Sequence, residues 1–457
     1  MDRRRFLLGL PNLAALPFAA QIQDAQPIQI NINPDRMLGA IPADFTGLGY
    51  EISSVARPGL LSAANRQYVQ LVRALGVHGV IRVGGNTSDY SSFSPAGEAV
   101  SAPKATVVNE ANLKELGTFL DATGWELIWG LNLGSGNEQQ AIEEARAVTA
   151  VAKGNLLAFE IGNEPDLFSH EGHRPKSYSY EEYLKQYRRY KTAIRARLPN
   201  APFAGPDAAV QTDWVSRFAA DEDNDLKLLT HHYYRECAKP TSTLDMLLAP
   251  DPKLAPELAK LKAASASSRV PYRICETNSF CGGGKPGVSD TFGAALWTLD
   301  FMFRLAWADC AGVNMETGVN QLGFVSWYSP ISDDEHGHYT PKPEYYGMLA
   351  FAGASGGERV ATNYDPAGAN LTAYAVLSPQ KRLLLAIINK EFARYADVTV
   401  TTGQSVRSAN VSRLTGPSLE SKEGVTFGGN VEDLRTQNQG CRLRVPAASA
   451  AIVSLQA

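Results

Sequence analysis

Between Phe45 and about Tyr328, short apolar runs alternate with amphipathic helical stretches. This alternation predicts a parallel sheet whose strands are joined by crossover helices. Eight strands are expected, at Phe45–Ile52, Val80–Gly84, Leu127–Leu131, Leu157–Gly162, Phe203–Pro206, Leu228–Tyr234, Tyr272–Glu276 and a run beginning near Gly312. A count of eight favours a closed (β/α)8 barrel over an open doubly wound sheet. Helices are expected in the gaps, for example at Ser179–Leu198 and Asp290–Trp307.

The hydrophobic pattern of the sequence changes after Tyr346. From Arg359 onward, alternating runs are punctuated by Gly, Pro and Asn, which predicts an antiparallel sandwich with strands at Leu371–Val376, Arg382–Ile388, Asp397–Thr401 and Ala451–Leu455. The early run Ile28–Ile32 alternates in the same way and is expected to join that sheet. The expected fold class is therefore α/β, a TIM barrel over 41–350 followed by a β-sandwich over 351–457, which also takes an N-terminal strand from 26–40.

The N-terminus has the composition of an export signal. Arg3, Arg4 and Arg5 precede an apolar run that is too short to span a bilayer, so residues 1–20 resemble a twin-arginine signal. Removing them takes away three Arg and one Asp, which changes the formal net charge from −4 to about −6. An exported, periplasmic or extracellular protein is expected, with no stable membrane span after signal removal. No basic run is visible, so a nucleic-acid partner is not expected.

Five cysteines, an odd number without CxxC spacing, argue against a zinc knuckle. They are Cys237, Cys275, Cys281, Cys310 and Cys441. At most two disulfides can form, and buried or pocket thiols are the interpretation favoured in a protein of this size.

Two glutamates close predicted strands. Glu164 ends the fourth strand in Asn163-Glu164-Pro165, and Glu276 ends the seventh. Pro165 biases Glu164 away from helical backbone angles, so the strand is expected to stop there with the carboxylate at the barrel rim. Each glutamate alone is compatible with a solvated loop residue, but side chains from these two strands can converge across the barrel mouth.

Such a pair suits retaining glycoside hydrolysis. One carboxylic acid protonates the leaving oxygen, and a carboxylate about 5–5.5 Å away attacks the anomeric carbon. Repulsion between two close carboxyl groups raises the pKa of the weaker acid. Asn163 is placed to hydrogen-bond a sugar 2-hydroxyl, and no metal or other cofactor is expected.

Longer motifs narrow the interpretation to a family. They are His231-His232-Tyr233-Tyr234, the run from Glu276 through Thr277-Asn278-Ser279-Phe280-Cys281 to Gly284, and Ser289-Asp290-Thr291-Phe292. With the Asn-Glu-Pro element, which by itself indicates only the clan of barrel glycosidases, they resemble glycoside hydrolase family 79, the β-glucuronidases and heparanases. The resemblance spans roughly Phe45 to Phe351 and the sandwich.

The resemblance implies roles for individual residues. Glu164 matches the acid/base and Glu276 the nucleophile, while Asn163 and Glu51 match residues that hold the sugar, with Asn86 in the corresponding loop after the second strand. His231 and Tyr233 share one face of the sixth strand. The matching Tyr233 is expected to touch the nucleophile, and His231 is equally compatible with a core histidine.

The carboxylate of a glucuronate needs its own donors. Gly282 and Gly283 can bring backbone amides close to an anion, and Tyr328 is the matching hydroxyl donor. Lys285 is close in sequence. Many family members carry a tyrosine where this chain has Cys281, so a carboxylate contact from that position is in doubt. A phosphate-loop interpretation of this glycine run is excluded because Pro286-Gly287 follows Lys285.

Three alternatives remain open from the sequence. The favoured function is an exo-acting β-D-glucuronidase on glucuronic-acid-containing glycans. An endo-acting, heparanase-like enzyme should show clustered Lys and Arg, whereas the loop Thr87–Ala105 contains only Lys104 and is long enough to close one side of the cleft. A non-catalytic carbohydrate-binding barrel should lack one of the two glutamates. A metal site at His336-Gly337-His338 is not favoured, because a third ligand is missing.

Overall fold

The structure is a computed structural model that describes residues 27–98, 105–222, 225–318, 326–334 and 336–456. The expected export signal lies outside these residues, as does part of the loop Thr87–Ala105. Among the described residues, no helix is both long enough and apolar enough to cross a membrane.

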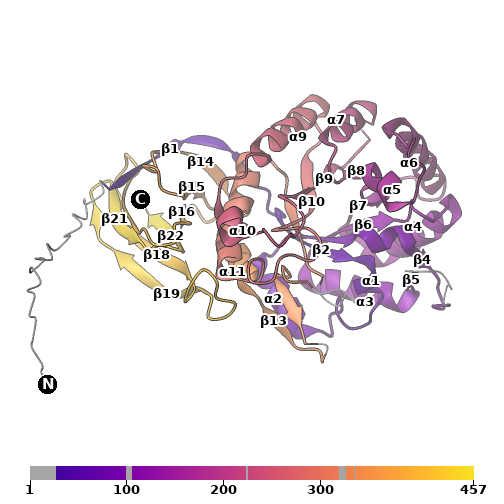
Figure 1. The fold of residues 1–457 in the computed structure, drawn as a ribbon, viewed down its shortest axis with the longest axis horizontal. Helices are drawn as coiled ribbons and strands as arrows, with labels where there is room; N and C mark the ends of the chain where they lie inside the picture. Colours follow the sequence, from indigo (N-terminus) through magenta and orange to yellow (C-terminus); the bar gives the residue numbers. More distant parts are fainter. Residues whose placement is uncertain (1–26, 99–104, 223–224, 319–325, 335, 457) are drawn as a thin grey trace, which may run out of the picture.

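A closed parallel barrel forms the larger part of the molecule (Figure 1). Its eight strands follow the order β7-β6-β3-β2-β11-β10-β9-β8, and a parallel bridge between Phe159 and Phe203 joins the first to the last. The strands are β2 (Thr46–Glu51), β3 (Val80–Gly84), β6 (Glu126–Leu131), β7 (Leu156–Ile161), β8 (Ala204–Ala208), β9 (Leu228–Tyr234), β10 (Tyr272–Asn278) and β11 (Val313–Glu316). All eight expected strands are therefore present, with ends that shift by a few residues.

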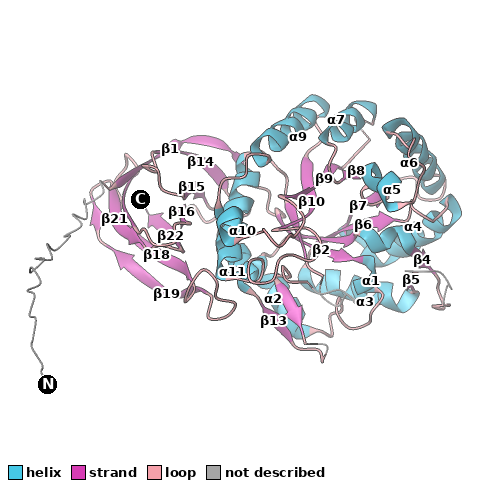
Figure 2. Ribbon diagram, viewed as in Figure 1, coloured by secondary structure: helices cyan, strands magenta, loops and turns pink. Residues whose placement is uncertain are grey.

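One main helix follows each barrel strand and covers the outside (Figure 2). These helices are α2 (Arg66–Leu75), α3 (Glu110–Thr123), α4 (Glu138–Ala152), α6 (Tyr180–Arg195), α7 (Thr212–Asp221), α9 (Leu254–Ser268), α10 (Phe292–Trp307) and α11 (Pro343–Phe351). Helices α3 and α4 begin at capping boxes built on Asn109 and Asn137, which satisfy backbone donors of the first turn. Shorter helices α1 (Ile52–Val55), α5 (Phe168–Glu171) and α8 (Leu244–Leu248) lie in the loops.

The second unit is a ten-stranded sheet of order β19-β18-β22-β16-β15-β14-β1-β17-β21-β20. Its strands are β1 (Ile28–Ala40), β14 (Glu358–Tyr364), β15 (Leu371–Leu377), β16 (Leu383–Asn389), β17 (Ala396–Thr401), β18 (Ser408–Thr415), β19 (Thr426–Leu434), β20 (Thr436–Gln437), β21 (Gly440–Val445) and β22 (Ser449–Gln456). Buried residues from both halves of the sheet form one core, so the sheet folds over on itself as a sandwich.

The N-terminal strand β1 joins this sheet, as the sequence predicts. It pairs antiparallel with β14 and parallel with β17, so the sheet that the sequence predicted as antiparallel is mixed at this one pairing. The correction has a simple cause, since β1 enters from outside the C-terminal segment and is not joined to β17 by a hairpin. In Figure 1 the indigo strand β1 lies among the yellow and orange strands of the far C-terminal part of the chain.

Charged side chains tie the two units together. Asp300 on α10 is buried and accepts hydrogen bonds from Thr372 Oγ1 at 2.7 Å and from the Tyr374 hydroxyl at 2.8 Å, both on β15. Lys390 and Arg304 complete its ion pairs. Burial acts to raise the pKa of Asp300, but the adjacent cations outweigh it and hold that pKa below its ordinary value.

The interior of the barrel is layered. A small apolar layer consists of Val80, Ile128, Ala158, Ala204, Leu228 and Cys275, from six different strands. Toward the carboxyl ends of the strands, the inward positions become charged, with Arg82, Glu160, Asp207 and His232 all buried. A TIM barrel keeps its reactive groups at this end, so the polar layer marks the candidate site.

Candidate active site

Glu164 lies at the barrel mouth just after β7. Its backbone adopts φ +50°, ψ +49°, in the left-handed region that is unfavourable for a residue with a Cβ. The strand itself ends at Ile161, one residue before the predicted end at Gly162 and three residues before Glu164, and the Glu164 amide donates to the Asp207 carbonyl at 3.0 Å. This hydrogen bond to the end of β8 helps to hold Glu164 in its unusual conformation.

Glu276 reaches the same mouth from β10. The register of β10 against β9 shifts between Ile274 and Glu276. A bulge of this kind re-aims side chains near active sites. Here Cys275 packs in the apolar layer inside the barrel, while Glu276 lies in the polar layer above it.

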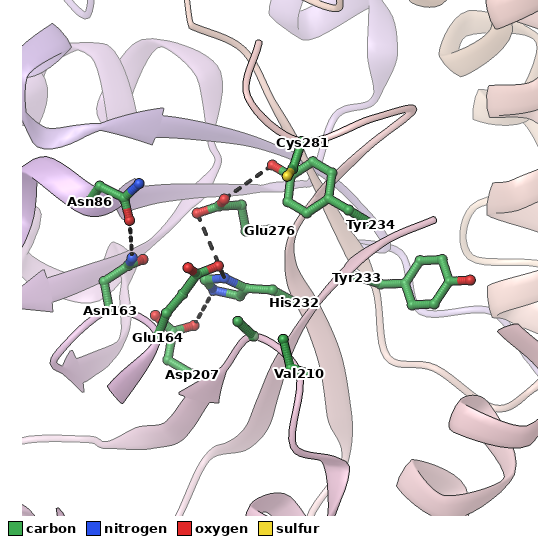
Figure 3. Close-up of polar contacts among 12 residues, drawn as sticks. Asn86, Asn163, Glu164, Asp207, Val210, His232, Tyr233, Tyr234, Glu276 and Cys281 are labelled. Atoms are coloured by element: carbon green, nitrogen blue, oxygen red, sulfur yellow. Dashed lines mark hydrogen bonds and ion pairs between the residues drawn. The ribbon is translucent and has the colours of Figure 1, made fainter. Parts of the chain in front are cut away.

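Figure 3 shows His232 between the two glutamates and Asp207. Its Nδ1 lies 2.8 Å from Glu164 Oε1 and 3.8 Å from Glu276 Oε2, and its Nε2 lies 2.7 Å from Asp207 Oδ1. Burial acts to lower the pKa of His232, but the Asp207 and Glu276 carboxylates outweigh burial and raise it well above the ordinary value. His232 therefore acts as a cation in this network.

Arg82, on β3, is the second buried cation. It donates from Nη1 to Glu276 Oε2 at 2.8 Å and from Nη2 to Asp207 Oδ2 at 2.6 Å. Its Nη2 also donates to Asn163 Oδ1 at 2.8 Å, and its Nε pairs with Glu160. An arginine that cannot be deprotonated fixes the orientation of every acceptor around it.

Within this network only the two glutamates are partly exposed at the barrel mouth. The side chains of Glu164 and Glu276 are 14% and 13% exposed, against 0% for Arg82 and His232 and 1% for Asp207. One carboxylate oxygen of Glu164 and one of Glu276 lie within 4.8 Å of each other. Burial raises the pKa of Glu164, and the hydrogen bond from His232 opposes that shift.

The same three residues, Glu164, His232 and Glu276, are also close enough to be ligands of one metal ion. Their chemistry does not favour this. Both ring nitrogens of His232 face carboxylate acceptors, so neither is a free lone pair, and the Arg82 guanidinium already neutralises Glu276.

The residues expected to hold the sugar lie around this pair. Asn163 donates from Nδ2 to Asn86 Oδ1 at 3.0 Å, which joins the loops after β7 and β3. Glu51, at the end of β2, accepts from the Thr87 amide at 2.8 Å and from the Thr87 hydroxyl at 2.6 Å. Burial raises the pKa of Glu51 to about 7.

The expectation for Tyr233 is wrong, and His231 is the core histidine that the sequence also allowed. Tyr234, and not Tyr233, reaches the nucleophile position, with its hydroxyl donating to Glu276 Oε1 at 3.1 Å. Tyr233 points away, as Figure 3 shows, and donates to Asp251 at 2.6 Å. His231 is 1% exposed on the same outer face, where burial lowers its pKa to about 3. Alternation along β9 turns His232 and Tyr234 inward, and the run of four polar aromatic residues gives no sign of which pair faces the barrel.

A disulfide joins the loops after β9 and β10. Cys237 and Cys281 are bonded, with Cα atoms 4.2 Å apart, so the expectation of thiols holds only for the buried Cys275, Cys310 and Cys441. The pairing follows because β9 and β10 are adjacent strands. Cys237 comes three residues after Tyr234 and Cys281 five residues after Glu276, and the two meet in an isolated bridge. Spacing along the sequence alone does not show such a meeting.

The glycine turn after Cys281 lies against Tyr328. Gly282, Gly283 and Gly284 have φ values of +75°, +85° and +83°, which residues with a Cβ rarely adopt. The Gly283 carbonyl accepts from the Trp327 amide at 2.7 Å. A Cβ on Gly284 would come within 3.2 Å of the Tyr328 ring. Lys285 packs its backbone on Ser289, and His338 pairs with Asp334 on the surface.

The sequence analysis missed Arg82, Asp207, His232, Tyr234 and Glu316. Two of them, Arg82 and Glu316, carried a usable signal. Arg82 is a charge inside the apolar run Val80-Ile81-Arg82-Val83, and such a charge must be buried and paired. Asp207 gave none, as its strand was expected to end at Pro206. Glu316 ends the eighth strand as Glu276 ends the seventh, and that parallel was available in the sequence.

Comparison with known proteins gives a consistent result. No family model matches the chain. A β-glucuronidase of Aspergillus niger is 28% identical over 435 residues, covering 87% of this chain and 78% of that protein. A β-glucuronidase of Neurospora crassa is 29% identical over 325 residues (62% of this chain, 57% of that protein). Heparanase of Mus musculus is 25% identical over 276 residues (54% and 47%).

Among solved structures, a 4-O-α-L-rhamnosyl-β-D-glucuronidase from Fusarium oxysporum 12S superposes with a TM-score of 0.77 at 20% identity, covering 93% of this chain and 100% of that chain. This likeness shows a shared barrel and sandwich fold. The sequence relatives and the motifs around Glu164 and Glu276 agree with this fold, and together they support the resemblance of the chain to glycoside hydrolase family 79, the β-glucuronidases and heparanases.

Proposed function

We propose that this glycoside hydrolase is an exo-acting, retaining β-D-glucuronidase that releases terminal glucuronic acid from glycans. The observation that carries the mechanism is the approach of Glu164 and Glu276 within 4.8 Å at the barrel mouth. Carboxyl groups of retaining glycosidases lie about 5–5.5 Å apart, whereas inverting enzymes need about 6.5–9.5 Å to admit a water molecule.

Glu164 acts as the acid. Burial raises its pKa, which keeps a proton available for the leaving oxygen. Glu276 acts as the nucleophile, since it accepts hydrogen bonds from Arg82 and Tyr234, which orient its carboxyl oxygens at the barrel mouth. After the glycosyl ester forms on Glu276, the deprotonated Glu164 draws a proton from water, which then hydrolyses the ester.

The remaining groups bind the sugar. Asn163 is held rigidly by Arg82 and Asn86, a placement that suits contact with the 2-hydroxyl beside the nucleophile. Glu51 and Asn86 take the neighbouring hydroxyls. The amides of Gly282 and Gly283, with the Tyr328 hydroxyl, receive the sugar carboxylate. The two amides and the hydroxyl are uncharged donors. They therefore bind the sugar carboxylate without adding a positive charge that would neutralise Glu276.

An endo-acting enzyme is the second candidate, favoured by the similarity to mouse heparanase. A cleft for a sulfated polyanion needs clustered cations. Within the described residues, both cations of the site, Arg82 and His232, are fully buried and already paired, so neither is available to a chain of sulfates. The charge of the site thus supports terminal-sugar cleavage.

We further propose that the protein is exported through a twin-arginine signal at residues 1–20. The disulfide between Cys237 and Cys281 supports an oxidising compartment. Expression with its native N-terminus, followed by fractionation and N-terminal sequencing of the exported form, tests this.

The function is tested by supplying the purified protein with 4-nitrophenyl β-D-glucuronide, β-D-glucoside and α-L-arabinofuranoside, and with heparan sulfate. We expect turnover of the glucuronide, with the β-anomer of glucuronic acid appearing first in proton NMR, and no fall in the average mass of heparan sulfate. Faster hydrolysis of either neutral glycoside overturns the substrate assignment. A rapid fall in heparan sulfate mass on size exclusion overturns exo action, and first release of the α-anomer overturns retention.

A further inference from the structure

Glu316 is a buried carboxyl group that the proposed mechanism does not use. It ends β11, which lies between β2 and β10, so its strand is flanked by those of Glu51 and Glu276. In the register of the barrel it lies opposite Gly49. It is 4% exposed, and it belongs to the polar layer at the mouth.

Both carboxyl oxygens of Glu316 lack a hydrogen-bond partner among the residues that the structure describes. Among the described residues, Glu160 also has one unpaired oxygen but is held by Arg82, whereas two other buried carboxyl groups accept hydrogen bonds from neutral donors. Glu144 accepts from Trp129 Nε1 at 2.9 Å, and Glu344 accepts from Asn278 Nδ2 at 3.0 Å. Leaving a buried polar group unpaired costs on the order of 1–3 kcal/mol, more if the group is charged. Such a group in a binding pocket indicates a partner that arrives with the ligand.

The fold makes room for this side chain. A Cβ on Gly49 would come within 2.4 Å of Glu316 Oε2, so the carboxyl group lies against bare backbone of β2. Arg82, on the next strand, bonds to three carboxylates and to Asn163 but not to Glu316. The group is therefore kept apart from the cation that serves its neighbours.

The charged and titratable groups that face Glu316 come from every element around it. They are Glu51 and Tyr50 on β2, Arg82 on β3, His232 and Tyr234 on β9, Glu276 on β10 and Tyr328 in the loop after β11. Burial, followed by repulsion from Glu276 and Glu51, raises the pKa of Glu316 well above the ordinary value. A neutral carboxylic acid has one O–H to donate.

Building on the proposed function, we propose that Glu316 is a specificity-determining residue of the sugar pocket, whose carboxyl group donates its O–H in a hydrogen bond to the carboxylate of the acidic sugar. No proton is transferred and no bond is broken. In this arrangement the unpaired oxygens of Glu316 gain a partner. The Glu316 carboxyl group is then an uncharged donor beside Tyr328, where the sugar carboxylate is proposed to bind.

A carboxylate fits this donor better than a hydroxyl does. It is an acceptor only, and a hydrogen bond from a neutral acid to an anion is about twice as strong as one between neutral groups. An ionised Glu316 would instead repel the substrate. Affinity for a glucuronide should therefore weaken as pH rises and Glu316 loses its proton, while affinity for a neutral glucoside should change little.

The test compares Glu316→Gln and Glu316→Leu on aryl β-glucuronide and aryl β-glucoside across pH. Glu316→Leu should raise KM for the glucuronide by about tenfold and KM for the glucoside by less than about twofold, as expected for loss of one charge-assisted hydrogen bond. Glu316→Gln keeps an N–H donor that does not ionise. Its KM for the glucuronide should stay within about threefold of the wild-type value at acid pH. Unlike the wild-type KM, it should not rise at alkaline pH.

Two further variants separate position from folding. Gly49→Ala should displace the Glu316 carboxyl group without altering its chemistry, and so raise KM for the glucuronide alone. Glu144→Gln is the matched control, because Glu144 is a buried carboxyl group on α4 with its own partner, Trp129 on β6, and it should leave the glucuronide-to-glucoside ratio unchanged. Circular dichroism monitors folding of all four variants.

An equal change of KM on both substrates, or no change, in Glu316→Leu and Gly49→Ala overturns the proposal while leaving the β-glucuronidase assignment intact. An alkaline rise in KM that persists in Glu316→Gln also overturns it. Lack of wild-type activity on the glucuronide defeats the proposed function itself, and this assignment with it.

Discussion

Asp207 is predicted to hold the catalytic layer together, and Asp207→Asn tests this without changing the size of the side chain. The carboxylate is 1% exposed and accepts from Arg82 Nη2 at 2.6 Å and from His232 Nε2 at 2.7 Å. The variant keeps one acceptor oxygen but turns an amide N–H₂ toward the other donor. The buried cations Arg82 and His232 are then neutralised by one carboxylate fewer.

The expected loss of stability is about 3–5 kcal/mol at neutral pH, the usual cost of removing one partner from a buried ion pair. The loss depends on pH. The pKa of Asp207 lies below its ordinary value, because the Arg82 and His232 cations outweigh burial, so its contribution is fully present above about pH 3.9 and disappears as pH falls through the folded pKa. The pKa of His232 is raised, so the His232 share is fully present below about pH 6.5 and is lost as pH rises through the folded value.

Urea unfolding of wild type and Asp207→Asn from pH 3 to pH 9 measures this difference. It should be largest between about pH 4 and pH 6.5 and should narrow on both sides. Loss of the Asp207 carboxylate lowers the pKa of His232 in the variant, so His232 becomes neutral at a lower pH and opposes the raised pKa of Glu164 less; the alkaline limb of kcat/KM should therefore move to higher pH. Asp213→Asn, at an 80% exposed side chain, is the control and should change stability by less than about 0.5 kcal/mol. A loss below about 1 kcal/mol for Asp207→Asn, or one that is constant with pH, refutes the reasoning.

Three further predictions concern separate parts of the molecule. Glu164→Ala should lose activity on poor leaving groups and recover part of it on activated aryl glucuronides when azide is added; no recovery in steady-state assays contradicts its role as acid/base. Tyr328→Phe should raise the rate on aryl β-glucosides relative to glucuronides, and an unchanged ratio would move the carboxylate site elsewhere, with Lys285 the next candidate. Reducing the Cys237–Cys281 disulfide should loosen the glycine turn and raise KM for glucuronides, measured with and without reductant; equal KM values show that the turn holds its shape unaided.

Much of the fold could be predicted from the sequence because local hydrophobic periodicity indicates where the strands and helices lie. Apolar runs such as Val80–Gly84 are buried on both faces and alternate with capped helices, which is enough to specify the barrel. The mixed pairing of β1 could not be predicted, since β17 lies far away in the sequence and no local pattern selects a parallel partner. Strand ends such as Asp207 were missed because a bulge extends β8 beyond Pro206.

The candidate site divides in the same way. Glu164 and Glu276 stand out because each closes a strand predicted from the sequence and lies beside a recognisable motif. Arg82 could have been found as a charge inside an apolar run, whereas His232 becomes apparent only when inward and outward positions are assigned in three dimensions. A one-residue error of phase along β9 selected His231 and Tyr233, on the wrong face.

The central claim is that Glu276 forms a covalent glycosyl-enzyme. Incubation with a 2-deoxy-2-fluoro-β-glucuronyl fluoride, which slows the second step more than the first, should inactivate the enzyme with time. Mass spectrometry of proteolytic peptides should then show one added fluoroglucuronyl group, on the peptide that contains Glu276, and Glu276→Gln should show neither label nor turnover. A label on another carboxylate, or near-normal turnover by Glu276→Gln, would contradict the account.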